Sequence, residues 1–297
     1  MILRHFPDHC PPEGWPNLVL NAVGREVEYA KHPGPLSVKC VLRGEEMHEV
    51  RGGGRFAVTP ERYLLLNHDQ VYGSWIRSSS DVETFSIFFR PELVGEVATS
   101  MAAGTEELLD QPMGPWGPVR FFEGLYDHDE VVSPVIARLR DEIAAGDDSS
   151  GRIEESLRVL LERLLERHLE LRREVDGLSA ARASTRHELY RRLKRAKDFI
   201  DSSLGERIDL AQTARVACLS PHHFLRSFKA VFGVTPHRYL TEARLDRAKD
   251  LLRRTDLPVT EICYAVGFES LGSFSALFRR RVGASPSEFR QRPQSHA

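Results

Sequence analysis

Alternation of apolar and polar side chains dominates residues 1–100. In "LSVKCVL" (36–42) every second residue is apolar, and "VETFSIFF" (82–89) alternates in the same way. A period of two is typical of β-strands. The stretch "RGGGRFAVTPERYLLLNHDQVYGSW" (51–75) predicts two more strands, with turns at "RGGG" and "NHDQ". Short strands in regular succession predict a β-sandwich or a β-barrel.

The period changes to that of a helix in residues 131–175. A first helix, "VVSPVIARLRDEI", is followed by a break at "AAGDDSSG" and a long second helix over 152–175. One face of this second helix carries an apolar stripe, formed by Ile153, Leu157, Leu160, Leu161, Leu164, Leu165, His168, Leu171 and Val175. So much leucine on one face needs a partner, which is either the β-domain or a second subunit. Residues 176–184, "DGLSAARAS", then predict an interdomain linker.

The last third of the chain contains an internal repeat. Residues 220–240, "SPHHFLRSFKAVFGVTPHRYL", align with residues 270–290, "SLGSFSALFRRRVGASPSEFR". Each copy starts with a serine N-cap, places two phenylalanines one helical turn apart and ends in Gly-x-x-Pro. A short helix with small residues precedes the first copy, which together with it predicts a helix-turn-helix. The connecting helix, 236–254, has a length of roughly 28 Å at 1.5 Å per residue, close to the ~34 Å of one DNA turn.

A helical wheel separates the two faces of the repeated helix. In the first copy Phe224 and Phe228 fall on the buried side. The outer side carries His222, Arg226 and Lys229, with Leu225 at its flank. Arginine pairs with guanine edges in the major groove and lysine holds phosphate, so this face predicts DNA recognition. An ordinary solvated helix face is the alternative.

The outer face of the second copy has few functional groups. Gly272 and Ala276 lie opposite the phenylalanines and have no side-chain hydrogen-bonding group. The residues that remain for DNA contact are Leu271, Ser273, Ser275 and Arg279. We therefore expect the first copy to specify the sequence and the second copy to position the protein on phosphates.

Charge is divided unevenly along the chain. Residues 182–297 contain 22 Lys and Arg against 12 Asp and Glu, whereas residues 1–181 contain 19 against 31. A basic C-terminal third joined to an acidic remainder is typical of a chain in which one module binds a polyanion and the rest is a separate domain. The sequence has no signal peptide and no membrane-length apolar run, and its four cysteines form no C-x-x-C pair. We therefore expect a cytoplasmic protein with reduced thiols.

Catalytic chemistry has no visible carrier in the sequence. His48, Glu49 and His68 are the candidates for a cupin-type metal site, but they form no H-x-H pair. No nucleophile elbow, phosphate loop or paired-carboxylate motif is present. We expect no metal, no cofactor and no enzymatic activity.

The C-terminal motifs, in their order and spacing, resemble the DNA-binding domain of AraC/XylS-type transcription regulators. The resemblance covers about residues 186–292 and rests on "LAQTA", the repeat, "RLDRAKDLL" and "GFES". It implies seven helices with two helix-turn-helix units. The base-contacting positions of the family match His222, Leu225 and Arg226 in the first copy, and Leu271, Gly272, Ser273, Ser275 and Ala276 in the second. This chain departs from the family in the second copy, where Ala276 stands at a position that is often arginine.

The resemblance also implies the organisation of the whole chain. The expected fold is α+β: a cupin-like effector-sensing barrel or sandwich (1–118), a helical dimerisation and linker region (119–184) and an all-α double helix-turn-helix domain (185–297). Candidate residues for lining an effector site are Trp15, Tyr63, His68, Tyr72 and Trp75, with an ordinary aromatic core as the alternative. Expected partners are duplex DNA, a small-molecule effector, a second copy of the chain and RNA polymerase. We expect an activator, but activation and repression both stay open.

Two other functions compete with that of an effector-controlled regulator. One is a cupin-type enzyme whose helical tail docks to a partner, which the absence of an H-x-H pair disfavours. The other is an architectural DNA-binding protein without an effector. Retention on heparin with a steep salt dependence distinguishes a regulator from the enzyme. Stabilisation of residues 1–180 by a metabolite distinguishes a regulator from the architectural protein.

Overall fold

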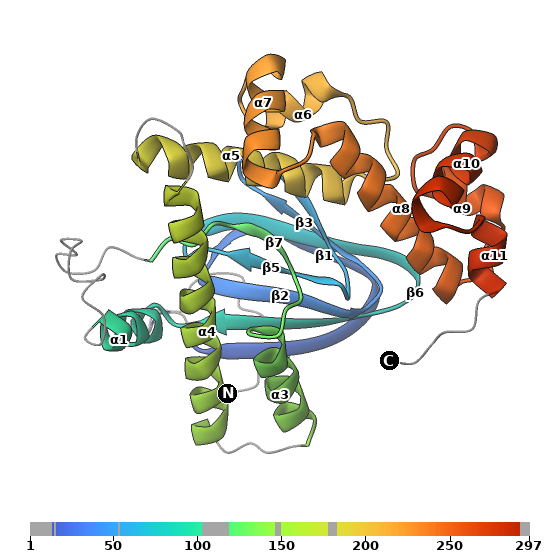
Figure 1. Cartoon of the computed structure of the whole chain (residues 1–297). Helices are drawn as coiled ribbons and strands as arrows, with labels where there is room; N and C mark the ends of the chain where they lie inside the picture. The colour runs from blue at the N-terminus through green and yellow to red at the C-terminus, as the bar shows by residue number, and fades with distance from the viewer. Residues whose placement is uncertain are drawn as a thin grey trace. The chain divides into compact units, whose positions relative to one another are not determined.

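The computed structural model describes residues 14, 16–52, 54–102, 119–145, 150–177 and 183–291 (Figure 1). The chain forms two compact units, Met1–Arg191 and Arg192–Ala297. The boundary between them falls inside helix α5 (Ala183–Ser202). None of the helices in the described residues combines the length and the apolar character needed to cross a membrane.

The N-terminal unit is built on a single antiparallel sheet of seven strands. In chain order the strands are β1 (Leu18–Gly34), β2 (Leu36–Arg43), β3 (Glu46–Val50), β4 (Gly54–Val58), β5 (Arg62–Leu66), β6 (Gln70–Phe89) and β7 (Gly124–Asp127). They are arranged in the order β4-β3-β6-β2-β5-β7, and β1 pairs with β6. The two ends of this order, β4 and β7, contact each other, so the sheet curls into a nearly closed barrel. The predicted barrel and the turns near residues 51 and 67 are confirmed.

Strand β6 organises the barrel because it is long enough to pair with three other strands. Its first half pairs with β3 and its second half with β2, while β1 follows it along most of its length. The register between β1 and β6 shifts twice, once near Gly24 and once after Tyr29. Such irregularities increase the local twist and help a sheet to curl. Strands as long as β1 and β6 were not predicted.

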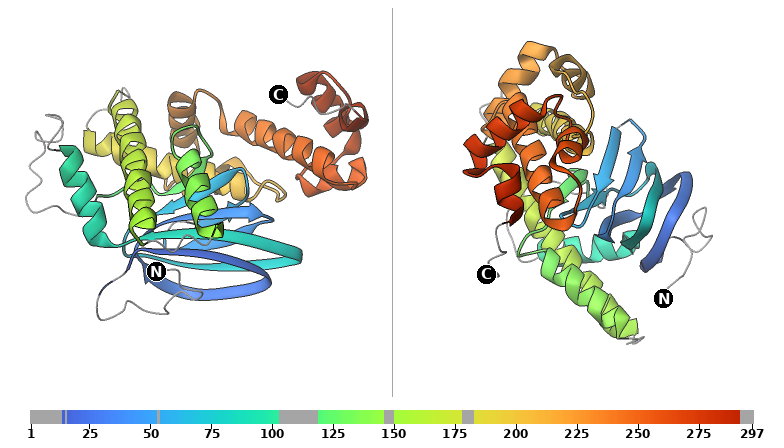
Figure 2. Two further views of the ribbon diagram at one scale, coloured as in Figure 1. Left: turned by 90° about the horizontal axis from the view of Figure 1, so that it is seen from below. Right: turned by 90° about the vertical axis from the view of Figure 1, so that its right-hand side faces the viewer.

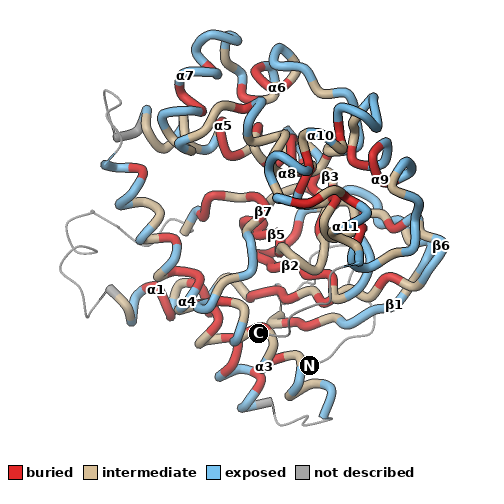
Figure 3. Tube along the Cα trace, turned by 45° about the vertical axis from the view of Figure 1, so that its right-hand side comes forward, coloured by how far each residue is buried: buried red, intermediate tan, exposed pale blue. Residues whose placement is uncertain are grey.

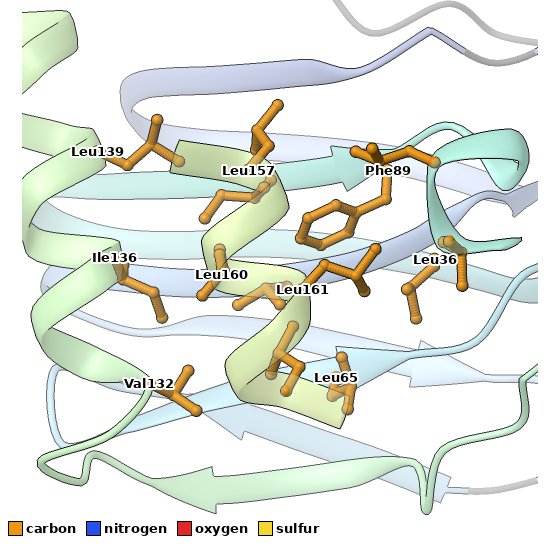
Figure 4. Close-up of a cluster of buried hydrophobic side chains, with 14 of the residues drawn as sticks. Leu36, Leu65, Phe89, Val132, Ile136, Leu139, Leu157, Leu160 and Leu161 are labelled. Carbon is orange, nitrogen blue, oxygen red and sulfur yellow. The ribbon is translucent and has the colours of Figure 1, made fainter. Parts of the chain in front are cut away.

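Three helices cover the outer face of this sheet: α1 (Pro91–Ala102), α3 (Ser133–Ala144) and α4 (Ser150–Asp176) (Figure 2, left). Successive strand residues point to opposite faces, so Val38, Cys40 and Phe89 face these helices. The apolar stripe of α4 packs on them, and Figure 4 shows Leu157, Leu160 and Leu161 on α4, which lies beside α3 over the sheet. The partner of the leucine stripe is therefore the chain's own sheet. The idea of a dimer seam along these leucines is wrong, because they are buried within one chain.

The C-terminal unit consists of short helices on one longer helix. They are α6 (Leu210–Val216), α7 (Pro221–Phe232), α8 (Pro236–Arg254), α9 (Val259–Ala265), α10 (Leu271–Val282) and α11 (Pro286–Gln291). Helices α6 and α7 form one helix-turn-helix, α9 and α10 form the other, and α8 joins them. The predicted double helix-turn-helix is confirmed.

Candidate nucleic-acid interface

Helices α7 and α10 start and end with the same local chemistry. The Ser220 hydroxyl accepts a hydrogen bond from the backbone N–H of His223, and the Ser270 hydroxyl accepts one from that of Ser273. Each helix stops at a glycine in the left-handed region, Gly233 at φ 73° and Gly283 at φ 80°. A side chain is costly in that conformation, so glycine ends the helix at a defined residue. The repeat in the sequence is thus a repeat of the residues that start and end each helix.

The buried faces of these two helices also match. Phe224 and Phe228 are fully buried on α7 with ring centroids 5.4 Å apart, and Phe274 and Phe278 on α10 lie 5.6 Å apart. A third ring joins each pair from the helix that follows. Tyr239 of α8 packs against Phe228, and Phe289 of α11 packs against Phe278. Aromatic pairs in such edge-to-face geometry add stability beyond burial alone. Rigid packing on one side fixes which side chains each helix presents on the other (Figure 3).

The outer face of α7 presents the predicted side chains to solvent. His222, Leu225, Arg226 and Lys229 are all exposed, and Leu225 at 38% is a large apolar side chain with little cover. Within residues 183–291, neither Arg226 nor Lys229 makes an ion pair. Two basic groups without a counterion on one helix face are available for a polyanion.

The outer face of α10 is mostly apolar or backbone, with charge at one end. Leu271, Ser273 and Arg279 are exposed and Ser275 is half-buried. Gly272 and Ala276 are exposed between them. Two further arginines that were not predicted as DNA contacts, Arg280 and Arg281, are exposed beside Arg279 in the last turn. A run of three arginines is a visible signal, and it adds cations rather than base-specific groups to this helix.

A contact centred on Arg244 of α8 links the two helix-turn-helix units. Its guanidinium donates to the backbone carbonyls of Leu204 and Glu206 at 2.9 and 2.7 Å and lies over the ring of Phe268. Gly267, at φ 84°, stands so close to the Leu204 carbonyl that a Cβ would collide with it. The loop after α5 precedes the first helix-turn-helix, and Phe268 lies in the turn of the second. These contacts therefore connect the two helix-turn-helix units within the C-terminal unit.

The residues predicted to line an effector site do not share one surface. Tyr63 faces the covering helices and stacks on Tyr126, while Tyr72 faces the barrel interior. Strand alternation places Trp75 on the face of β6 opposite to Tyr72. His68 lies in the β5–β6 turn with its side chain 29% exposed. Trp15 lies outside the described residues. Among the described four, Tyr72 is the one that points into the barrel.

The barrel interior contains ionisable groups that the sequence analysis did not select. Lys39 on β2 and Glu46 and His48 on β3 are buried, and Nζ of Lys39 donates to the Tyr72 hydroxyl at 3.0 Å. Burial lowers the pKa of Lys39 from 10.5 to about 7. Burial alone would raise the pKa of Glu46, but His48, Ser74 and Lys39 more than offset this and keep it below 4.5. The spacing Glu-x-His on one strand was the available signal.

These interior groups do not form a metal site. Across the described residues, no group of three or more His, Cys, Asp and Glu side chains could hold a metal ion. Glu49, which follows His48, points outward and pairs with Lys31 at 2.8 Å. The cupin-type ligand set considered from the sequence is thus not assembled by His48, Glu49 and His68.

Several known transcription regulators are similar to this chain in sequence. A family model described as a helix-turn-helix domain matches residues 213–292. The arabinose operon regulatory protein of Salmonella typhimurium is 30% identical over 265 residues, which cover 86% of this chain and 85% of that protein. The probable transcriptional regulator LumQ of Photobacterium leiognathi is 37% identical over 92 residues, which cover 31% of this chain and 37% of LumQ. An AraC-type transcriptional regulator structure from Chromobacterium violaceum is 29% identical, covers 39% of this chain and 100% of its own, and gives a TM-score of 0.34.

The match to the Salmonella protein is long enough to include both compact units, since it covers 86% of the chain. The helix-turn-helix match falls on the capped repeat described above. The fold, the capped repeat and the sequence similarity over most of the length all indicate the same family. The chain belongs to the AraC/XylS family of transcription regulators.

Proposed function

We propose that the chain is a sequence-specific DNA-binding regulator in which α7 reads bases, α10 positions the protein on phosphates and the barrel senses a small-molecule effector. The observation that carries the DNA-binding part is the exposed face of α7, where Arg226 and Lys229 have no counterion within residues 183–291. Two helix-turn-helix units held by α8 support a continuous footprint. A helix of 19 residues places them roughly 28 Å apart, near one turn of DNA.

The first test is the salt dependence of duplex binding by the full-length protein. Each phosphate contact releases condensed counterions, so log K should fall linearly with log salt at about −0.9 per contact. We expect a slope that corresponds to several contacts, measured by fluorescence anisotropy between 50 and 300 mM salt. A slope near zero would contradict DNA binding through this basic surface. An acidic polypeptide of equal charge density serves as the competitor that separates DNA from any polyanion.

The second test compares Arg226→Ala with Arg279→Ala. Loss of the α7 arginine should cost about 1–3 kcal/mol on the selected site and flatten the preference at one or two base pairs. Loss of the α10 arginine should weaken all sequences alike and lower the salt slope by about one. Both variants are measured against a randomised-site library, with Arg163→Ala on the exposed face of α4 as the control.

The opposite result would reverse the roles of the two helices. If Arg226→Ala keeps the full sequence preference while a change at Leu271 or Ser275 abolishes it, then α10 reads the bases. Leucine can discriminate a thymine methyl group, so this outcome has a physical basis. That result would reverse only the roles of α7 and α10, and the proposal that the protein binds DNA would remain valid.

The remaining parts of the proposal follow from family membership. A regulator that binds a promoter acts in the cytoplasm and can contact RNA polymerase, and a second copy of the chain can double its site. Because the leucine stripe of α4 is buried in the N-terminal unit, a dimer would use another surface. Sedimentation of the full-length protein with and without a duplex bearing two sites measures this directly.

A further inference from the structure

The C-terminal end of α4 and the start of α5 meet within the N-terminal unit, as Figure 1 shows. The ring of Phe122, which is fully buried, packs against both helices. Its centroid lies 5.3 Å from that of the His168 imidazole on α4. It also lies 5.9 Å from the imidazole of His187 and 4.8 Å from the ring of Tyr190, both on α5. Phe122 thus joins the two helices at a junction with ionisable neighbours.

Helical spacing brings basic side chains from both helices to this junction. His168 and Arg172 are four residues apart on α4, and His187 and Arg191 are four residues apart on α5. Residues at this spacing are neighbours on one helix face. The guanidinium carbon of Arg191 lies over the Phe122 ring, 5.4 Å from its centroid. Two helices thus gather positive charge around one buried ring.

The two arginines at the junction have no carboxylate partner. Within the described residues, neither Arg172 nor Arg191 forms an ion pair. Asp176 at the end of α4 is already engaged, because it pairs with His187 at 2.9 Å. Other arginines of α4 do pair with carboxylates, namely Arg158, Arg163 and Arg167. The missing counterions are therefore a feature of the junction and not of the whole helix.

The imidazole of His168 responds to this uncompensated charge. The residue is 8% exposed and also packs against the ring of Phe121, and its Nδ1 has no hydrogen-bond partner within the described residues. Burial lowers its pKa from 6.5 to about 4, and the charges of Arg172, Arg191 and His187 act in the same direction. A bound anion would replace this repulsion with attraction and favour the protonated imidazole.

The number of donors decides which anion fits. A guanidinium group pairs with a carboxylate or a phosphate through two parallel hydrogen bonds. One arginine is enough for a planar carboxylate, which has two oxygens. A phosphate group offers three acceptor oxygens, so it can pair with donors on two helices at once. Arg172 on α4 and Arg191 on α5 are such a pair of donors.

We propose that Arg172 and Arg191, together with His168, form a binding site for a phosphate group at the junction of α4 and α5. The arginines hold the phosphate oxygens, and the protonated imidazole of His168 adds a third positive charge. The inference depends neither on the barrel interior nor on the DNA-facing side of α7. The phosphate group belongs either to free phosphate or to a small phosphorylated molecule, and the binding test distinguishes these sources.

Binding of three anions to the full-length protein tests the proposal. The probes are inorganic phosphate, glycerol 3-phosphate and acetate at equal ionic strength, and the readout is the NMR titration of His168 in histidine-labelled protein. We expect both phosphate compounds to raise the pKa of His168 by roughly one unit or more, and acetate to leave it unchanged. Tighter binding of glycerol 3-phosphate indicates a phosphorylated molecule, and equal binding indicates free phosphate. A pKa that neither phosphate compound shifts, or that acetate shifts equally, overturns the proposal.

Variants connect the binding to the junction. Arg172→Gln and Arg191→Gln each remove a charged donor, so each should weaken phosphate about tenfold or more. Arg163→Gln, which removes the same charge from the exposed face of α4, is the matched control and should leave binding unchanged. If Arg191→Gln does not fold, because it removes the group that lies over Phe122, Arg172→Gln keeps the test decisive. Phosphate binding that survives these changes but is lost in Arg226→Ala overturns the proposal.

Contact with DNA is the competing explanation for two arginines without counterions. If Arg172 or Arg191 held a phosphate of the duplex, its replacement would lower the slope of log K against log salt by about one. We expect both glutamine variants to keep the wild-type slope in the fluorescence anisotropy experiment described above. A lowered slope assigns these arginines to the DNA interface and overturns the proposal.

Discussion

Replacing Leu160 with aspartate is expected to unfold the N-terminal unit. This leucine is fully buried between α3 and the sheet, with Leu161 and Leu157 beside it (Figure 4). Truncation of a buried leucine costs about 2–5 kcal/mol, and an unpaired carboxylate in the same place adds a penalty of its own. The sum, at least about 4 kcal/mol, is a large share of the 5–15 kcal/mol that a typical domain has. Urea denaturation followed by circular dichroism measures the loss.

The control for this change is Arg163→Asp on the exposed side of the same helix. It adds the same side chain and breaks an exposed ion pair with Glu166, which contributes little. We expect a loss within about 1 kcal/mol. If Leu160→Asp instead yields a folded monomer from a wild-type dimer, then the stripe lies between subunits and the packing described for α4 is incorrect.

Replacing Lys39 with methionine is expected to stabilise the N-terminal unit, and the gain should depend on pH. Burial lowers the pKa of Lys39 from 10.5 to about 7. Between these values the unfolded chain binds more protons than the folded chain, so the contribution of Lys39 to the free energy of unfolding rises with pH. The destabilisation is complete below about pH 7 and is relieved towards pH 10.5. At 1.36 kcal/mol per pH unit it amounts to at most about 5 kcal/mol.

The net gain will be smaller than this limit, because Glu46 loses a compensating charge when Lys39 is removed. We expect roughly 2–4 kcal/mol at pH 6, decreasing clearly by pH 9.5, from urea denaturation of both proteins across this range. Lys31→Met, at an exposed position that pairs with Glu49, should show no such trend. A gain that is constant with pH would mean that Lys39 is not the titrating group.

The capped repeat could be predicted because its determinants are local. Ser220, Pro221 and Gly233 act within one helix, and the phenylalanine spacing marks the buried side without knowledge of the neighbours. Hence the bounds of α7 and α8 follow from the sequence almost residue by residue. The exposure of the residues proposed to contact DNA could be predicted for the same reason, because the residues opposite the buried phenylalanines must face the solvent.

Features that depend on distant partners could not be predicted. The leucine stripe of α4 shows that one face is buried, but periodicity does not say whether a sheet or a second subunit covers it. Strand β1 was missed because most of its residues are exposed on both faces, which removes the apolar alternation. Strand β7 is only four residues long.

The polar side chains inside the barrel were not predicted, for a related reason. In residues 36–42 the alternation marks one apolar face, and nothing in the pattern shows that Ser37 and Lys39 on the other face are buried as well. In the structure both faces of β2 are buried, one under the helices and one inside the barrel. A lysine that points inward has the same pattern as one that points outward. Burial on two sides is a property of the closed sheet, not of the strand.

The contact between Arg244 and the two loops has a consequence for operator architecture. Because Arg244 contacts both Leu204 and Phe268, and Gly267 packs against the Leu204 carbonyl, we expect the two helix-turn-helix units to resist extending or rotating towards a displaced half-site. One inserted base pair shifts the second contact by ~3.4 Å and rotates it by roughly 35°, since a turn takes 10–10.5 base pairs. We therefore expect the DNA sites of this protein to be constrained in phase as well as in sequence, with mismatched phasing absorbed by bending of the DNA.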